Sequence, residues 1–161
     1  MHAETTVDLI EVSPLDPRAI TCLEHYYAEL ATRLDKGFEV HLSADPEAGS
    51  MIPPKGSFLI ATQGEELLGC VGLKGTSKGY AEVKRLWVSP QARGLGLART
   101  LMAELESRAL ALGHHVLRLD SNSALQEAIA MYRKWSWAEI NRFNEDPYPD
   151  VFFEKKLSPE Q

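Results

Sequence analysis

Hydrophobic and polar residues alternate first over residues 6–12 (TVDLIEV), which predicts an opening β-strand. Asp16-Pro17 then supplies a helix cap and a proline suited to the first helical position. Beyond it, a three-and-four spacing of apolar residues predicts an amphipathic helix that Gly37 ends, with a stripe made of Ile20, Leu23, Tyr27, Leu30 and Leu34. Residues 38–56 are rich in proline and glycine and predict a long loop with a short helix near 45–50.

The remaining pattern alternates between strands and helices. A hairpin is predicted for residues 58–62 and 67–73, with its turn at 63–65, and a third strand for residues 80–88. An apolar stripe from Leu95 to Ala109 predicts a helix that Gly113 ends. The last predicted elements are a strand at 115–120, a helix at 123–135 and strands at 138–142 and 151–157. This order predicts an α+β domain with a mixed sheet, and the length of 161 residues favours one domain over residues 1–161.

Composition and charge narrow the class of protein. The chain has 17 lysines and arginines against 23 acidic residues, and its formal net charge of −6 argues against a general nucleic-acid binder. Cys22 and Cys70 lack the spacing of a metal site, so we expect reduced, buried thiols and no metal. The sequence shows neither a signal-peptide pattern nor an apolar run of about 18 residues, so we expect a cytoplasmic protein without a membrane partner.

Residues 88–102 (VSPQARGLGLARTLM) place two glycines, Gly94 and Gly96, where a strand passes into a helix. A helix start presents unpaired N–H groups, and glycines let an anion approach them, so a diphosphate seat is one interpretation. Arg93 and Arg99 could add positive charge beside it. A dinucleotide fingerprint fails, because its first glycine should follow the strand at once and its third glycine position holds Arg99. The second interpretation is that the glycines only ease packing of the helix on the sheet.

The surrounding residues resemble the GNAT superfamily of acetyl-CoA-dependent N-acetyltransferases. Gln91-Ala92-Arg93-Gly94-Leu95-Gly96 fits the family's Gln/Arg-x-x-Gly-x-Gly/Ala motif, and Asn122 and Tyr132 are similar to its second signature. The chain departs from the family at Ser136-Trp137, where Gly-Phe is usual. The resemblance implies the GNAT fold, a central mixed and mostly antiparallel sheet of six to seven strands flanked by helices, and transfer of an acetyl group from acetyl-CoA to an amine.

The resemblance also implies where acetyl-CoA would bind. Backbone groups at residues 86–88 (Leu86, Trp87, Val88) would hold the pantetheine arm and the acetyl group. The motif residues that would surround the diphosphate are Gln91, Arg93, Gly94, Leu95, Gly96, Leu97 and Ala98. Asn122 would contact the pantetheine arm, although the run Ser121-Asn122-Ser123 is equally typical of a helix cap.

Two residues are candidates for catalysis. Tyr132 would protonate the departing thiolate, since a phenol with a usual pKa near 10 can donate to the sulfur as charge develops there. The alternative for Tyr132 is a core aromatic on a striped helix. Glu82 would act as the general base on the strand that faces the acceptor. The alternatives for Glu82 are a surface carboxylate paired with Lys84 and a water chain that replaces it.

The sequence says less about the identity of the acceptor amine than about the rest of the site. The resemblance implies a pocket from the first helix, the loop at 38–56 and residues 144–150, with Tyr27 and Tyr148 as candidate contacts. Lys84 and Arg85 would anchor a carboxylate of a small amine, which we favour, whereas the acidic residues near Tyr148 would attract a polyamine or a protein lysine. A protein lysine or N-terminal acetyltransferase and a non-catalytic acyl-CoA sensor stay open as alternatives, as do a monomer and a homodimer.

Overall fold

The computed structural model describes residues 6–33 and 46–158. Its strands are β1 (Asp8–Glu11), β2 (Ser57–Gln63), β3 (Glu66–Gly75), β4 (Ala81–Val88), β5 (Val116–Ser121), β6 (Ala138–Ile140) and β7 (Val151–Lys156). Its α-helices are α1 (Pro17–Arg33), α2 (Leu97–Ala111) and α3 (Gln126–Lys134), with short 3₁₀ helices η2 (Ala48–Met51) and η3 (Pro90–Ala92). These bounds agree with the predicted order of strands and helices.

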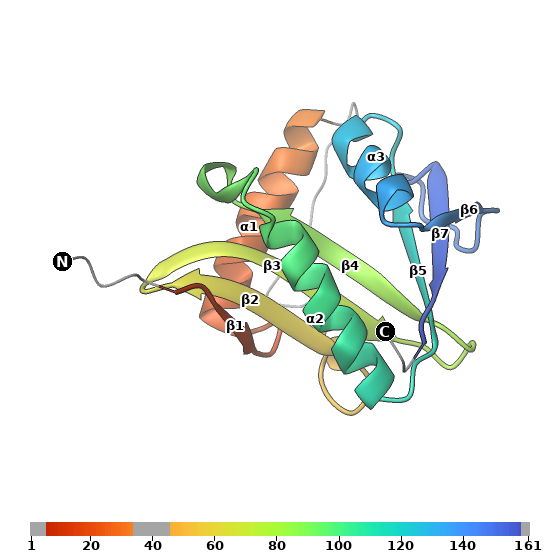
Figure 1. The fold of residues 1–161 in the computed structure, drawn as a ribbon, viewed down its shortest axis with the longest axis horizontal. Helices are drawn as coiled ribbons and strands as arrows, with labels where there is room; N and C mark the ends of the chain where they lie inside the picture. Colours follow the sequence, from red (N-terminus) through yellow and green to blue (C-terminus); the bar gives the residue numbers. More distant parts are fainter. Residues whose placement is uncertain (1–5, 34–45, 159–161) are drawn as a thin grey trace.

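Within the described residues, seven strands form one sheet in the order β1-β2-β3-β4-β5-β7-β6 (Figure 1). Strands β1 to β4 are antiparallel neighbours, and β7 pairs antiparallel with both β5 and β6. The β4–β5 pair is parallel, because α2 carries the chain back across the sheet between them. The predicted mixed, mostly antiparallel sheet is therefore confirmed.

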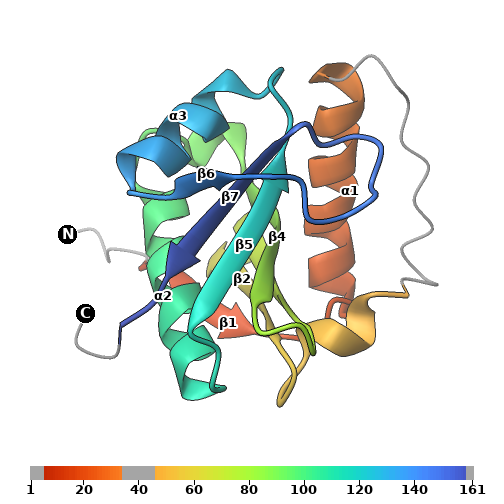
Figure 2. The same cartoon turned by 90° about the vertical axis from the view of Figure 1, so that its right-hand side faces the viewer.

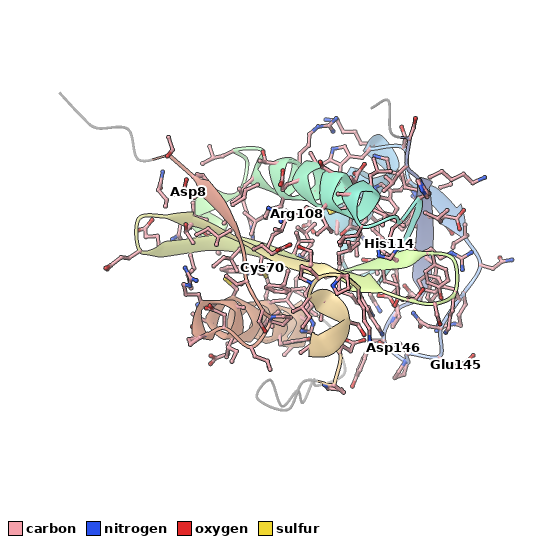
Figure 3. All side chains as sticks on the ribbon, turned by 90° about the horizontal axis from the view of Figure 1, so that it is seen from below. Asp8, Cys70, Arg108, His114, Glu145 and Asp146 are labelled. Atoms are coloured by element: carbon pink, nitrogen blue, oxygen red, sulfur yellow. The ribbon has the colours of Figure 1, made fainter. Side chains whose placement is uncertain are left out.

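Helices cover both faces of the sheet, with α2 and α3 on one side and α1 on the other (Figure 2). Figure 3 shows the sheet nearly edge-on between α2 and α1. Alternate residues of β2 enter the two cores, with Leu59 and Ala61 in the α2 cluster and Phe58 and Ile60 in the α1 cluster. Both faces of the central strands are apolar for this reason, which is why their sequence reads as a continuous apolar run.

The α2 helix begins later than its apolar stripe predicted. Gly96 is its N-cap, with φ of 80°, and Leu95 lies before the helix with 79% of its surface exposed. The expectation that Leu95 belongs to the buried stripe is therefore wrong. The other end matches the prediction, because Gly113 adopts a φ of 91° just past the helix and His114 N–H donates to the Ala109 carbonyl at 2.8 Å. The predicted end of the first helix at Gly37 lies outside the described residues.

Candidate active site

A cleft opens where β4 and β5 stop pairing. Among the described residues the two strands pair only through Ala81 with Leu117 and Glu82 with Arg118. Both strands then continue, and Figure 1 shows them apart at their C-terminal ends. The cleft between them has a volume of about 730 Å³ and is lined by β4, the start of α2, the end of β5, α3, α1 and part of residues 146–149.

One wall of the cleft is the free edge of β4. Beyond Glu82, the backbone groups of β4 that point toward β5 have no strand partner, so they can pair with an extended ligand. A bulge interrupts β4 here, since residues 85 and 86 face a single residue of β3 and Arg85 has a φ of 61°. Leu86, Trp87 and Val88 line the cleft. This is the wall where the sequence predicted the pantetheine arm.

The glycine loop has a backbone conformation that favours glycine. Gly94 and Gly96 have φ of 83° and 80°, a left-handed conformation that other residues adopt at a cost. A Cβ built on either glycine meets no described atom within 4 Å. The glycines therefore do not serve close packing of the helix on the sheet, and that interpretation is wrong. Gly94 and Gly96 line the cleft, as do Arg93, Leu97 and Ala98, whereas Gln91 and Leu95 do not.

The amides of this loop are available to a ligand. Within the described residues, the N–H groups of residues 94–99 donate to no carbonyl or side chain, and the first bond of the helix runs from Thr100 N–H to Gly96 O at 3.1 Å. Six consecutive donors at the start of a 15-residue helix form a ready site for a phosphate. These amides, including that of Leu95, fit the diphosphate of acetyl-CoA.

The two arginines of the loop are already engaged. Arg93 donates to both carboxylate oxygens of Glu29 on α1, at 2.7 and 2.6 Å, and to the Val88 carbonyl at 3.0 Å. Glu29 also accepts a hydrogen bond from Trp87 Nε1 at 3.2 Å, and it was not among the predicted site residues. Arg99 lies over the Trp135 ring, with its guanidinium carbon 5.6 Å from the ring centroid. Arg93 would have to leave Glu29, at least in part, to serve a diphosphate.

Tyr132 lies where α3 faces the cleft. Its ring packs against Trp135, Trp137 and Phe153, so it belongs to the core as well as to the cleft lining. The hydroxyl has no hydrogen-bond partner among the described residues. Burial, together with the negative charge of Asp120, raises the pKa of the Tyr132 phenol well above its usual value. The group is therefore protonated at neutral pH and able to donate its proton.

Asn122 lines the cleft, but its side chain is used within the protein. Its Nδ2 donates to the Tyr148 carbonyl at 2.6 Å, and its Oδ1 accepts from the Ala124 N–H at 2.9 Å. Helix α3 begins at Gln126 with Leu125 as its N-cap, so Asn122 does not cap that helix. The structure shows Asn122 tying the end of β5 to residue 148, and contact with a pantetheine arm stays a prediction.

Glu82 does not line the cleft. It is 7% exposed, sits at the closed end where β4 still pairs with β5, and faces Lys74 on β3. Its carboxylate lies 3.7 Å from the Lys74 Nζ. The expectation that Glu82 faces the acceptor is therefore wrong, because the strands separate only after it. The alternative, in which Glu82 is a surface carboxylate paired with Lys84, is also wrong, because Glu82 is buried and Lys84 Nζ lies 4.0 Å from Glu47 instead.

The candidate acceptor residues do gather at the cleft. Tyr27, Lys84, Arg85 and Tyr148 all line it, and the Arg85 guanidinium lies 6.0 Å from the Tyr27 ring centroid. Figure 2 shows the loop between β6 and β7 reaching past the end of β5 toward α1. The acceptor side of the cleft therefore lies between this loop, α1 and β4.

Glu47, which the sequence did not single out, joins three cations beside these residues. Its carboxylate lies 2.8 Å from Lys74 Nζ, 3.3 Å from Arg85 and 4.0 Å from Lys84. Burial alone would raise the pKa of Glu47, but the Lys74 hydrogen bond and the three positive charges outweigh burial and lower it. Glu47 comes from the loop before η2, where the sequence offered only proline and glycine as signals of a functional loop.

The glycine loop, the open strand edge and the protonated phenol all lie at one cleft. The model of the Acetyltransferase (GNAT) family matches residues 21–137 of this chain. The chain belongs to the GNAT acetyltransferase family. It is therefore an acyltransferase, and the acetyl donor of this GNAT acetyltransferase is acetyl-CoA.

Individual proteins are similar to this GNAT acetyltransferase in sequence or in fold. An IAA acetyltransferase of Azospirillum brasilense is 31% identical over 156 residues, covering 94% of this chain and 98% of that protein. A GNAT-family acetyltransferase of Staphylococcus aureus superposes with a TM-score of 0.78 at 15% identity, covering 95% of this chain and all of the other. The structure of yncA from Salmonella typhimurium with its cofactor acetyl-CoA gives a TM-score of 0.71 at 15% identity, covering 95% of each chain. At these identities the two solved structures are similar in fold.

No group of three or more histidine, cysteine, aspartate or glutamate side chains in the described part of the chain is arranged to hold a metal ion. None of the helices over residues 6–33 and 46–158 has the length and the apolar character that crossing a membrane requires.

Proposed function

We propose that this GNAT acetyltransferase moves the acetyl group of acetyl-CoA to a primary amine of a small molecule, which attacks directly in a ternary complex. The observation that carries the proposal is the set of residues that line one cleft. The unpaired amides of the glycine loop, the Tyr132 phenol and the residues Lys84 and Arg85 all line it. Both substrates then have room to meet without a covalent acetyl-enzyme.

Acetyl-CoA would lie along β4 with its diphosphate on the amides of residues 94–99. The free edge of β4 supports this placement, because an extended pantetheine arm carries amide groups that can pair with strand backbone. The acetyl group would then sit beside Leu86 and Val88, deep in the opening between the strands.

Transfer would proceed by attack of the neutral amine on the thioester carbonyl carbon. The nitrogen lone pair forms the new C–N bond, the C–S bond breaks, and its electron pair goes to sulfur. Tyr132 would give its proton to that sulfur and regain one from water, and the nitrogen would release its one excess proton to water. The raised pKa keeps Tyr132 protonated at neutral pH, so that its proton is present when the C–S bond breaks.

A small acceptor is favoured by the walls around the amine side of the cleft. Tyr27, Arg85 and Glu47 line a volume shared with the cofactor, in which a protein segment would have little space. IAA is a second candidate acceptor, because the relative named IAA acetyltransferase is 31% identical over 94% of this chain.

The experiment that tests the proposal incubates the protein with acetyl-CoA and a panel of acceptors and identifies the products by mass spectrometry. The panel holds amino acids, their methyl esters, polyamines, lysine-containing peptides and IAA. We expect a product heavier by one acetyl group from a small primary amine, with release of free CoA. Acetylation of peptides alone would overturn the small-molecule part, and acetylation of no acceptor would overturn the proposal.

A further inference from the structure

The carboxylates that line the cleft differ in whether a cation holds them. Three are bound to basic side chains: Glu29 to Arg93 at 2.6 Å, Glu127 to Arg33 at 2.6 Å, and Glu47 to the lysines and arginine described above. Among the described residues Asp120 and Asp146 have no cation within ion-pair distance. An incoming positive charge would therefore find its available counter-ion at one of these two aspartates.

Asp120 is the penultimate residue of β5, the strand opposite β4 across the cleft, and its side chain is held in place by one hydrogen bond. Its Oδ2 accepts from Asn144 Nδ2 at 2.7 Å, while Oδ1 accepts no hydrogen bond from the described residues. Asn144 is itself fixed, because Arg142 donates to its carbonyl at 3.2 Å and to the carbonyls of Asp146 and Pro149 at 2.9 and 2.8 Å. One carboxylate oxygen is thus anchored and the other is free for a ligand.

Asp120 and Tyr132 both line the cleft, and the negative charge of Asp120 acts on the Tyr132 phenol. Burial and the negative charge of Asp120 raise the pKa of Tyr132, and Asp120 contributes in the same direction to Tyr26 on α1, after burial and the neighbouring phenols. The cation of Arg118, two residues earlier on β5, is bound to Glu154 at 2.9 Å and lies over the Tyr80 ring. Among the described residues Asp120 therefore has the Asn144 amide as its partner and no cation, and its charge acts on the phenol proposed to protonate the thiolate.

We propose that Asp120 is the residue that binds the ammonium group of the acceptor and places its nitrogen beside Tyr132. This inference rests on the proposed function, because it assigns the acceptor's amino group to a position in the same cleft. Glu82, which the sequence predicted as the general base, lies outside the cleft beside Lys74, whereas Asp120 lines the cleft. Asn144 is the positioning residue, since it orients the aspartate without touching the acceptor.

An aspartate in this position selects acceptors that are charged when they bind. The ammonium loses a proton to water before attack, and the neutral nitrogen then lies within reach of the thioester carbonyl. The positive charge is lost at that step, so the contact with Asp120 contributes more to binding of the acceptor than to stabilising the later steps. A variant without the charge should therefore affect KM more than kcat.

The test compares the wild-type enzyme with Asp120→Asn, which can still accept the hydrogen bond from Asn144. The probes are the small primary amine with the highest kcat/KM in the panel, its trimethylammonium analogue and the neutral tert-butyl analogue of the same shape. Neither analogue can be acetylated, so each is measured as a competitive inhibitor. Glu145→Gln is the control for net charge, because Glu145 (labelled in Figure 3) follows Asn144 in the chain but does not line the cleft.

We expect Asp120→Asn to raise KM for the amine about tenfold or more, an energy of about 1.4 kcal/mol, with a smaller change in kcat. The wild-type enzyme should bind the trimethylammonium analogue more tightly than the tert-butyl analogue, and the variant should bind both equally. The Kd for acetyl-CoA, measured by calorimetry, should stay the same in both proteins.

Three results would count against the inference. If the wild-type enzyme acetylates an amine and Asp120→Asn keeps its KM and its preference for the charged analogue, the inference fails while the proposed function stands. An equal rise in KM for Glu145→Gln would attribute the effect to net charge and would also overturn it. If the wild-type enzyme acetylates no amine, the proposed function and the inference fail together.

Discussion

The glycine loop gives the sharpest prediction, which compares Gly96→Asp with Gly96→Asn. Gly96 has a φ of 80°, a conformation that asparagine and aspartate tolerate better than other residues with a side chain. A Cβ at this position meets no described atom within 4 Å, so we expect both variants to fold. We expect each to lose about 1–2 kcal/mol of stability from the backbone, a fall in Tm of about 2–8 °C. The two side chains have nearly the same shape and differ in charge.

The negative charge of the aspartate should decide how tightly the two variants bind acetyl-CoA. A carboxylate about 6 Å from one phosphate charge, at an effective dielectric constant of about 20, repels it by about 3 kcal/mol. Gly96→Asp should therefore bind acetyl-CoA about 100-fold more weakly than Gly96→Asn, and the gap should narrow as salt screens the charges. Calorimetric titration of the two folded variants at low and high salt measures this difference. Equal affinities would refute the placement of the diphosphate at this loop.

The remaining predictions concern residues around the cleft. Glu82→Gln should lower the unfolding free energy by about 1 kcal/mol through loss of the Lys74 ion pair, a fall of about 2–4 °C in Tm, and leave the shape of the pH–rate profile unchanged; a selective loss of rate at low pH would restore Glu82 as the base. Glu29→Gln should release Arg93 toward the diphosphate and tighten acetyl-CoA binding by about 1 kcal/mol or less at low salt, whereas weaker calorimetric binding would show that the ion pair supports the site instead. Because burial and Asp120 raise the pKa of Tyr132, kcat should show no decline from phenol ionisation up to about pH 10, and a descending limb that disappears in Tyr132→Phe would contradict this. The same raised pKa contributes stability that is complete below about pH 10 and is lost as the pH rises through the folded-state value, which denaturation at alkaline pH can follow.

The order of elements was predictable because each element carries its own short-range pattern. The α1 stripe, the hairpin turn at Gly64 and the helix end at Gly113 depend on residues that are close in sequence. The glycine loop was predictable for the same reason, although its positive φ angles put the helix start two residues beyond the first apolar position of the stripe, Leu95. Residues close in sequence were therefore sufficient to predict the loop that we propose for the diphosphate.

The walls of the cleft were less predictable because they depend on a bulge and on distant ion pairs. An unbroken β4 would place Ala81, Val83 and Trp87 on one face, yet the bulge at Arg85 moves Trp87 to the α1 core while Leu86 and Val88 join the α2 core. No local signal in the sequence marks that extra residue.

The ion pairs around the cleft could not be predicted from the sequence for a related reason. Glu29 is 64 positions from Arg93, and Glu47 is 38 positions from Arg85, so no short motif connects them. Asp120 stood in the sequence at the end of a predicted strand, two residues before Asn122. Its proposed role depends on residues that are distant in sequence, above all Asn144 and Tyr132.

The central claim is that Tyr132 protonates the departing thiolate in a cleft that binds acetyl-CoA. The most direct test measures kcat and the Kd for acetyl-CoA in Tyr132→Phe, with Tyr80→Phe as a control that removes a tyrosine hydroxyl outside the cleft. We expect Tyr132→Phe to lose about 10²–10⁴-fold in kcat while its Kd stays within about twofold of wild type, and Tyr80→Phe to keep both values. A Tyr132→Phe enzyme that retains the wild-type kcat would contradict the account.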